Sequence, residues 1–427
     1  MVLAPSEYQQ RYALLAVSLG VFCVQLDSFA LNLALPDIGA ALGADSGLSL
    51  TVSAYLLTVG VLMPVAGRAS DLLGRKRLLR LGILLFGAGS ALCGAASSLP
   101  FLVVSRVVQG AGGALIMPVG IAFVTQVFSE EARGRALGRA LGAGGIATAC
   151  GPFVGGVLTE FLSWPAVFWI NVPVCLAAAW SCRRAPEVHP ASSSGRCRLT
   201  RDDAPVSGRF LLRNRQYVVL TLAGSVANAA TVVFLFIIPL WLHNIWGLSS
   251  LGSGITFLLP SLAMTVAGPL AGRVRASDAK AVMSVCLACS AGGLCGLAWS
   301  PGFVTYFLAM SACGGVLGLA NAVTLVGTQS VVTADQAGTA SGITKTAVTI
   351  SGGLGVGVVA EASPRALTIG VLQDTLVSTA VLCCGTAVGL ALSELWGRRR
   401  VSANRSRGRL LPVRYAQRVV RRPDLDE

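Results

Sequence analysis

Residues 26–36, LDSFALNLALP, place a single carboxyl group, Asp27, inside a long apolar segment. An ionised carboxylate in hydrocarbon costs at least about 2.5–3.5 kcal/mol, so such acids normally face a cavity or a partner and have a function. Burial favours the protonated form of a carboxyl group, and a nearby cation favours the ionised form. We therefore expect Asp27 to bind a proton on one side of a barrier and release it on the other. The alternative is that it caps a kink or forms a purely structural pair.

Two basic side chains, Arg106 and Lys345, also lie within apolar segments. Arginine stays charged, so Arg106 cannot carry a proton, but it can set the electric field at Asp27 and promote proton release. A static structural ion pair is the alternative. For Lys345, we consider contact with an anionic substrate, or extension of its ammonium group toward the cytoplasmic end of its helix.

A stripe of small residues in the apolar segment 136–161 suggests close helix packing. It comprises Gly144, Thr148, Gly151, Gly155 and Gly156. Small residues at this spacing let helices approach closely, and Pro152 among them can bend the helix. The stripe either tightens an outer gate between two halves of the protein or provides general membrane packing.

The composition explains which elements hold these residues. Of 427 residues, 54% are hydrophobic and 12% are charged, whereas roughly a quarter of residues are charged in soluble proteins. Apolar stretches long enough to cross about 30 Å of hydrocarbon predict twelve membrane helices, at 11–36, 48–69, 78–98, 101–126, 136–161, 164–182, 216–242, 250–272, 279–300, 302–327, 337–360 and 372–395. The expected fold class is an all-α polytopic membrane protein.

The predicted helices fall into two sets of six. Residues 1–182 form an N-terminal six-helix bundle and residues 216–395 a C-terminal one. Between them, residues 183–215 are polar and rich in Ser, Pro and Arg, as is typical of a flexible cytoplasmic linker. Residues 396–427 form a basic cytoplasmic tail.

Basic residues alternate between the connecting segments in a way that predicts the orientation. The linker carries eight arginines and the tail ten, while the segments on the opposite side carry only Arg365. Because cytoplasmic loops are rich in Lys and Arg, both termini should be cytoplasmic in a plasma, or inner, membrane. The net charge of +14 then reflects topology, and no nucleic-acid partner is expected. Binding of the tail to anionic lipid headgroups or to nucleic acid is the alternative.

No enzymatic constellation accompanies the helices. The sequence contains no GxxxxGK[ST] or HExxH motif, and His189 and His243 are its only histidines. We expect no catalytic residues, no metal and no cofactor, with a proton gradient as the energy source.

The turn between the second and third predicted helices, GRASDLLGRKRLLR, combines glycines, an acid and a basic cluster. Its notable residues are Gly67, Asp71, Gly74, Arg75 and Arg77. Glycines allow two helix ends to approach, and an acid near basic residues can form a charge latch at the cytoplasmic surface. A basic loop that only fixes topology is the alternative.

This turn resembles the loop hallmark of the major facilitator superfamily, and other segments are similar to its proton-coupled multidrug antiporters. RVVQGAGGALIMP resembles the Arg-and-Gly motif of the fourth helix, and GAGGIATACGPFVGGVL resembles the antiporter motif, with Gly151, Pro152, Gly155 and Gly156. LDSFALNLALP and SWPAVFWINVP match the same branch. That branch usually has fourteen helices, and this chain resembles a twelve-helix version.

The resemblance implies two six-helix bundles around a central cavity, with access alternating between the two sides of the membrane. It implies proton coupling by Asp27 and Arg106. Asn32, Gln109, His243 and Lys345 become candidates for substrate or cavity contacts. His243 replaces a usual Gln. In the segment 337–360, Lys345 replaces a usual Asn and Val348 a usual Arg, so compensation for the lost Arg is a further interpretation of Lys345.

We therefore expect a proton-coupled antiporter that exports small hydrophobic organic compounds such as drugs or antibiotics. Its partners would be the organic substrate, protons and the lipid bilayer. A metabolite uptake or exchange carrier is the first alternative. A membrane-embedded enzyme and a non-transporting sensor that uses the basic tail are alternatives from other classes.

Overall fold

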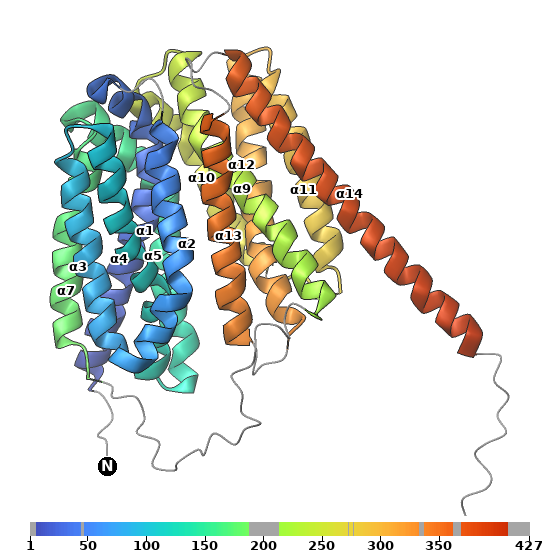
Figure 1. The fold of residues 1–427 in the computed structure, drawn as a ribbon, viewed down its shortest axis with the longest axis horizontal. Coiled ribbons are helices and arrows are strands. Elements are labelled where there is room, and N and C mark those ends of the chain that lie inside the picture. Colours follow the sequence, from blue (N-terminus) through green and yellow to red (C-terminus); the bar gives the residue numbers. More distant parts are fainter. Residues whose placement is uncertain are drawn as a thin grey trace, which may run out of the picture.

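Every secondary-structure element in the part of the chain that the structure describes is a helix (Figure 1). The structure is a computed structural model, and it describes residues 6–43, 47–187, 213–271, 273–275, 277–332, 337–361 and 369–408. Its helices are α1 (Glu7–Leu42), α2 (Leu48–Leu73), α3 (Arg75–Gly94), α4 (Leu99–Val127), α5 (Glu130–Leu162), α6 (Ala166–Trp169), α7 (Asn171–Arg184), α9 (Arg215–Asn244), α10 (Ser250–Ala271), α11 (Ala279–Ala298), α12 (Phe303–Ser330), α13 (Ala337–Glu361) and α14 (Ile369–Gly408). The predicted all-α fold is confirmed.

The helices have the length and the surface of membrane spans. Eleven helical segments of the described chain are long and apolar enough to cross a membrane. The short α6 and α7 together make one of them, and α13 is a twelfth long helix. Large apolar side chains point outward, with Leu72, Phe161 and Val304 exposing 81%, 70% and 69% of their surface. An apolar exterior of this kind suits contact with lipid.

The helices form two halves that follow the chain order (Figure 1). In the first half, α1 packs on α5 and α7, while α4 packs on α2 and α3. In the second half, α10 packs on α12, α11 on α14, and α9 on α13. The halves meet along two principal seams, formed by α2 with α13 and by α5 with α10.

Glycines make these two seams unusually close. A Cβ atom placed on Gly60 of α2 would lie 2.6 Å from Ile350 Cγ1 of α13. A Cβ atom on Gly156 of α5 would lie 2.5 Å from the Ser250 carbonyl oxygen of α10. These distances are shorter than side-chain packing permits, so the main chains approach each other directly, as in other small-residue membrane interfaces.

Local sequence signals set several helix ends. Ser6 caps α1 by accepting a hydrogen bond from the Gln9 amide at 3.3 Å, and the Gln9 side chain accepts one from the Ser6 amide at 3.3 Å. Gly74 alone separates α2 from α3, and its φ of 92° is a conformation that favours glycine. This glycine belongs to the loop motif found in the sequence.

The connecting segments predicted from composition are described only in part. The helix α7 ends at Arg184 and α9 begins at Arg215, so most of the predicted linker 183–215 lies outside the described residues. The helix α14 continues to Gly408 and projects past the neighbouring helices (Figure 1). The first part of the predicted tail is therefore helical, and residues 409–427 lie outside the described range.

The close packing of α5 on α1 generates a stability prediction. A Cβ atom on Gly155 would lie 2.6 Å from the Ala30 carbonyl oxygen. We expect Gly155→Ala to destabilise the protein by about 1–3 kcal/mol, the usual cost of overpacking, and to lower the melting temperature in detergent. The matched control is Gly142→Ala on the exposed face of the same helix, where a Cβ meets nothing within 4 Å. Equal melting temperatures for the two variants would contradict the packing described.

Candidate functional site: a buried ion pair beside a central cavity

A fully buried ion pair joins the two charged residues of the N-terminal half. Asp27, in the middle of α1, has 0% exposure, and Arg106 of α4 has 1%. Arg106 Nη1 donates to Asp27 Oδ2 at 2.6 Å. Each charge compensates the other in a region that excludes water. Removing either partner would leave a buried charge without its counter-ion.

Three neutral side chains extend the pair into a hydrogen-bonded network. Gln109 Nε2 donates to Asp27 Oδ1 at 2.8 Å and to Ser90 Oγ at 2.9 Å, while Gln109 Oε1 accepts from Arg106 Nη1 at 2.6 Å. Asn171 Nδ2 donates to Ser90 Oγ at 3.0 Å. The network thus links α1, α3, α4 and α7, and both carboxylate oxygens of Asp27 accept hydrogen bonds.

The remaining side of the Arg106 guanidinium faces α2. Its Nε donates to the Thr51 carbonyl oxygen at 3.0 Å, and its Cζ lies 4.2 Å from the centre of the Tyr55 ring. A cation over an aromatic face is stabilised electrostatically. Arg106 and Tyr55 also line a cavity between the two halves, whereas Asp27 does not. Arg106 therefore connects the buried Asp27 to the cavity wall.

A cavity of about 390 Å³ lies between the two halves. The first half contributes residues of α1, α2, α4 and α5, and the second half contributes residues of α9, α10, α12 and α13. Its wall is mainly apolar, with Phe29, Leu56, Met63, Leu235 and Met264 among the lining residues. A volume of several hundred Å³ with an apolar wall is typical of sites for small organic molecules.

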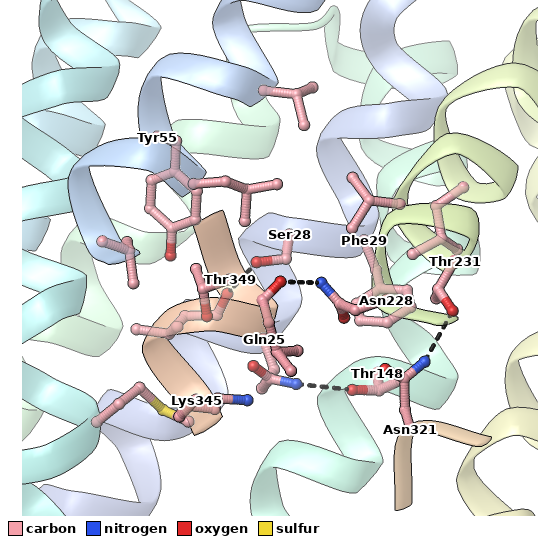
Figure 2. A pocket seen from close by; sticks show the side chains of 18 of the residues that line it. Gln25, Ser28, Phe29, Tyr55, Thr148, Asn228, Thr231, Asn321, Lys345 and Thr349 are labelled. Carbon is pink, nitrogen blue, oxygen red and sulfur yellow. Dashed lines mark hydrogen bonds between the residues drawn. The ribbon is translucent and has the colours of Figure 1, made fainter. Parts of the chain in front are cut away.

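Polar side chains in the cavity wall connect neighbouring helices (Figure 2). Gln25 Nε2 donates to Thr148 Oγ1 at 3.3 Å, which links α1 to α5. Asn321 Nδ2 donates to Thr231 Oγ1 at 2.7 Å, which links α12 to α9. Asn228 Nδ2 donates to the Val348 carbonyl oxygen at 2.7 Å, which links α9 to α13. Amide and hydroxyl groups therefore interrupt the apolar wall at fixed positions.

The four residues proposed from sequence for substrate or cavity contacts occupy different environments. Asn32 and Lys345 line the cavity, and Asn32 Nδ2 donates to the Ser28 carbonyl oxygen at 2.9 Å. Gln109 has 0% exposure and belongs to the ion-pair network instead of the cavity wall.

His243 lies apart from the cavity described above. His243 is exposed near the C-terminal end of α9, where its Nδ1 lies 3.2 Å from the Leu248 carbonyl oxygen. The helix end carries the imidazole away from the cavity. The cavity wall described here does not include His243, and a role for it in substrate contact stays a prediction.

The loop motif contacts the ends of neighbouring helices. Arg75 Nη1 donates to the Ala122 carbonyl oxygen of α4 at 2.9 Å, while Arg77 is exposed. Gly67 has open space beside it, and Gly74 forms the break between α2 and α3. The side chain of Asp71 lies outside what the structure describes, so the predicted charge latch stays a prediction.

Lys76, the residue between the two arginines, binds the end of α7. Its Nζ donates to the carbonyl oxygens of Arg183 at 3.1 Å and Ala185 at 2.6 Å, and pairs with Glu187 Oε1 at 3.2 Å. A cation at the C-terminal end of a helix stabilises the exposed carbonyl groups there. This contact joins the loop motif to the last helix of the first half.

The antiporter-motif residues pack in two directions. Gly151 and Gly155 lie against α1, since Cβ atoms placed on them would approach Phe29 Cβ to 2.7 Å and the Ala30 carbonyl oxygen to 2.6 Å. Gly156 lies against α10 in the other half. The carbonyl oxygen of Pro152 faces Gly254 of α10, 2.7 Å from a Cβ atom placed there. The motif thus serves both helix packing within one half and contact between halves.

Two acids of the first half lie at the N-terminal end of α10. Ser250 Oγ donates to Asp37 Oδ2 at 2.5 Å, and the Leu251 amide donates to Glu160 Oε2 at 3.4 Å. Acidic groups are favourable at the N-terminus of a helix because unpaired amides are concentrated there. These contacts join the two halves at the end of the molecule where α10 begins.

The family model described as Major Facilitator Superfamily matches residues 17–356, which is most of the chain. The chain belongs to the major facilitator superfamily. It is similar to Multidrug resistance protein 3 of Bacillus subtilis strain 168, with 33% identity over 164 residues, covering 38% of this chain and 32% of the relative. It is also similar to Riboflavin transporter RibZ of Clostridioides difficile strain 630, with 34% identity over 173 residues, covering 40% of this chain and 38% of the relative. The matched segments span about a third of the length of these curated relatives.

Solved structures share the fold of this superfamily member at low sequence identity. An inward-facing, unoccupied bacterial homologue of the human lysosomal transporter Spinster superimposes with a TM-score of 0.71 at 15% identity, covering 91% of this chain and 98% of that one. A D-xylose–proton symporter gives a TM-score of 0.69 at 14% identity, covering 87% of this chain and 97% of that one. These likenesses establish the fold, and the family match establishes a multi-pass membrane protein.

The buried ion pair generates a stability prediction. We expect Asp27→Asn and Arg106→Gln each to lower stability by about 3–5 kcal/mol, because each leaves one buried charge without its partner. The double variant Asp27→Asn/Arg106→Gln removes both charges, so it should lose less than the sum of the two single losses. Thermal unfolding of the four proteins in detergent measures this coupling. Strictly additive losses would show that the pair does not interact energetically.

Proposed function

We propose that this protein is a secondary active transporter that exchanges protons for small, mainly hydrophobic organic molecules, and that it exports them across the plasma membrane. The observation that carries the proposal is a buried carboxylate, Asp27, whose ion-pair partner Arg106 lines an apolar cavity. The cavity supplies space for the substrate. The carboxylate supplies a group that can be neutralised by a proton. Both termini are cytoplasmic in this proposal.

Protonation of Asp27 would change the balance of forces in the network. The ionised carboxylate accepts from Arg106 and Gln109 at 2.6 and 2.8 Å. Adding a proton removes the negative charge, so the attraction to Arg106 weakens and the guanidinium becomes free to move toward the cavity that it lines. Loss of the proton restores the pair. Arg106 therefore favours proton release, as its permanent charge predicts.

Alternating access requires the seam contacts to separate. Asp37, Glu160 and the glycine contacts of α5 join the halves at the N-terminal end of α10. Opening that end requires these contacts to break while the opposite ends of the halves approach, as in rocking of two repeats around a fixed site. The cavity and the Asp27–Arg106 pair would then be open to one side of the membrane at a time, so that the proton and the substrate enter from opposite sides in different steps of the cycle.

The energy available from protons is sufficient for export. One proton moving down about 100 mV gains roughly 2.3 kcal/mol, and one pH unit adds roughly 1.4 kcal/mol. Their sum supports about a 500-fold substrate gradient for one proton exchanged. The proposed exporter therefore needs no nucleotide.

A metabolite carrier of the same fold is the second candidate function. One relative bears the name of a riboflavin transporter, and the cavity wall carries several amide and hydroxyl groups that can bind a polar metabolite. Vesicle orientation separates the two candidates. An exporter accumulates substrate in inverted vesicles, whereas an uptake carrier accumulates it in right-side-out vesicles.

The first transport prediction concerns the carboxylate. In inverted vesicles energised with a proton gradient, addition of a substrate should release protons for the wild type and not for Asp27→Asn, because the amide cannot bind and release a proton. A panel of toxic compounds in efflux-deficient cells identifies the substrate beforehand. The matched control is Asp374→Asn, an exposed acid on α14, which does not line the cavity. Equal proton release by Asp27→Asn and the wild type would refute the coupling role.

The second transport prediction concerns the seam. The variant Asp37→Cys/Ser250→Cys places two thiols where a hydrogen bond of 2.5 Å joins the halves. Oxidation should cross-link them and stop transport, and a reductant should restore it, since the seam must open in every cycle. Each single cysteine variant, oxidised in the same way, controls for the native cysteines. Transport that continues through a demonstrated cross-link would contradict alternating access at this seam.

A further inference from the structure

Lys345 is a cavity-lining cation that the proposed coupling mechanism does not use. It lies on α13, where Lys345, Val348 and Thr349 share one helical face and all three line the cavity. Figure 2 shows its side chain extending into the space toward Gln25 and Thr148 of the opposite half. The lysine side chain is therefore directed at the cavity.

The charges around the cavity do not balance. Arg106 and Lys345 are the charged residues among the described residues that line it. Arg106 is neutralised by Asp27 at 2.6 Å. Lys345, in contrast, makes no hydrogen bond or ion pair with any residue in the described part of the chain. The cavity thus presents one basic side chain, Lys345, that has no acidic partner among the described residues.

An ammonium group without a counter-ion is costly in a largely apolar wall, because transfer of a charge from water is repaid only by pairing or hydrogen bonding. A ligand that brings a negative charge would supply the missing partner. Charge-assisted hydrogen bonds of this kind are stronger than those between neutral groups. A lipophilic cation in the same place would instead meet a charge of its own sign.

The rest of the wall defines the other features of such a ligand. Phe29, Leu235 and Met264 offer apolar surface for a hydrophobic body. The cavity volume of about 390 Å³ fits a small organic molecule. An acidic group at one end and an apolar body at the other would satisfy both parts of the lining.

We propose that the cavity binds small amphipathic organic acids, with the anionic group paired to Lys345 and the apolar body against the wall formed by Phe29, Leu235 and Met264. This inference rests on the proposed function and narrows its substrate class from hydrophobic compounds in general to hydrophobic anions. Lys345 is then a specificity-determining residue, and Asp27 with Arg106 remains the proton-coupling pair.

The test uses three probes that share one ring system. They are 1-naphthaleneacetate, its neutral amide 1-naphthaleneacetamide, and the cation 2-(1-naphthyl)ethylammonium. Affinities for the purified full-length protein are measured by equilibrium dialysis with the wild type, Lys345→Gln and Lys345→Arg. The control Lys280→Gln removes a lysine of α11, a helix that does not line the cavity.

We expect the wild type to bind the acid about tenfold more tightly than the amide, a difference of about 1.4 kcal/mol, and the cation more weakly than both. Lys345→Gln should lose the preference for the acid while retaining affinity for the amide. Lys345→Arg and Lys280→Gln should keep the preference. Retained amide binding also shows that the glutamine variant is folded.

Acid binding that is equal in wild type and Lys345→Gln, or absent from both, overturns the inference. The outcome is separable from that of the proposed function. Lysine-dependent binding of the acid without proton-driven efflux in inverted vesicles would support the anion site and refute proton-coupled export. Proton-driven efflux with no lysine-dependent preference for acids would support proton-coupled export and refute the anion site.

Discussion

The ion pair between Asp27 and Arg106 is the constraint on which the N-terminal half depends. Two opposite charges with 0% and 1% exposure are compatible with a membrane interior only while they remain together. Gln109 and Ser90 complete the hydrogen bonding, and this requirement fixes the rotation and depth of α1, α3 and α4 relative to one another. The position of Arg106 in the cavity wall follows from the same arrangement. The ion pair that stabilises the packing of these helices is therefore also the proposed site of proton binding.

The second half contributes different polar groups to the cavity. Among its described residues, the cavity receives asparagine and threonine side chains that bond to neighbouring helices, and one lysine that does not. The halves thus contribute unequal chemistry to a shared space. Under the proposed mechanism the first half handles protons, while Lys345 of the second half selects the charge of the substrate. Such a division allows substrate preference to change without disturbing the coupling residues.

Much of the fold could be predicted from the sequence, because span length and apolarity are local properties, and the predicted segments correspond to the helices observed. The motif residues Asp27 and Arg106 were also identified from sequence, although their roles stay predictions. The contributions of Ser90, Asn171 and Tyr55 were missed. Small polar and aromatic residues are common in membrane helices, and their convergence depends on helix rotation, which one sequence does not reveal. The position of His243 outside the cavity wall has a similar origin, since a matching position in a motif does not give its depth along the helix.

The glycine seams have a consequence for the speed of the transport cycle. Where the helices of the two halves meet at glycines, as at Gly60 and Gly156, separation breaks mostly dispersion contacts. The hydrogen bonds at the start of α10, to Asp37 of α1 and Glu160 of α5, are discrete contacts between the halves. Turnover could therefore be adjusted during evolution by changing the reach of these two acids, since neither is among the residues that line the cavity.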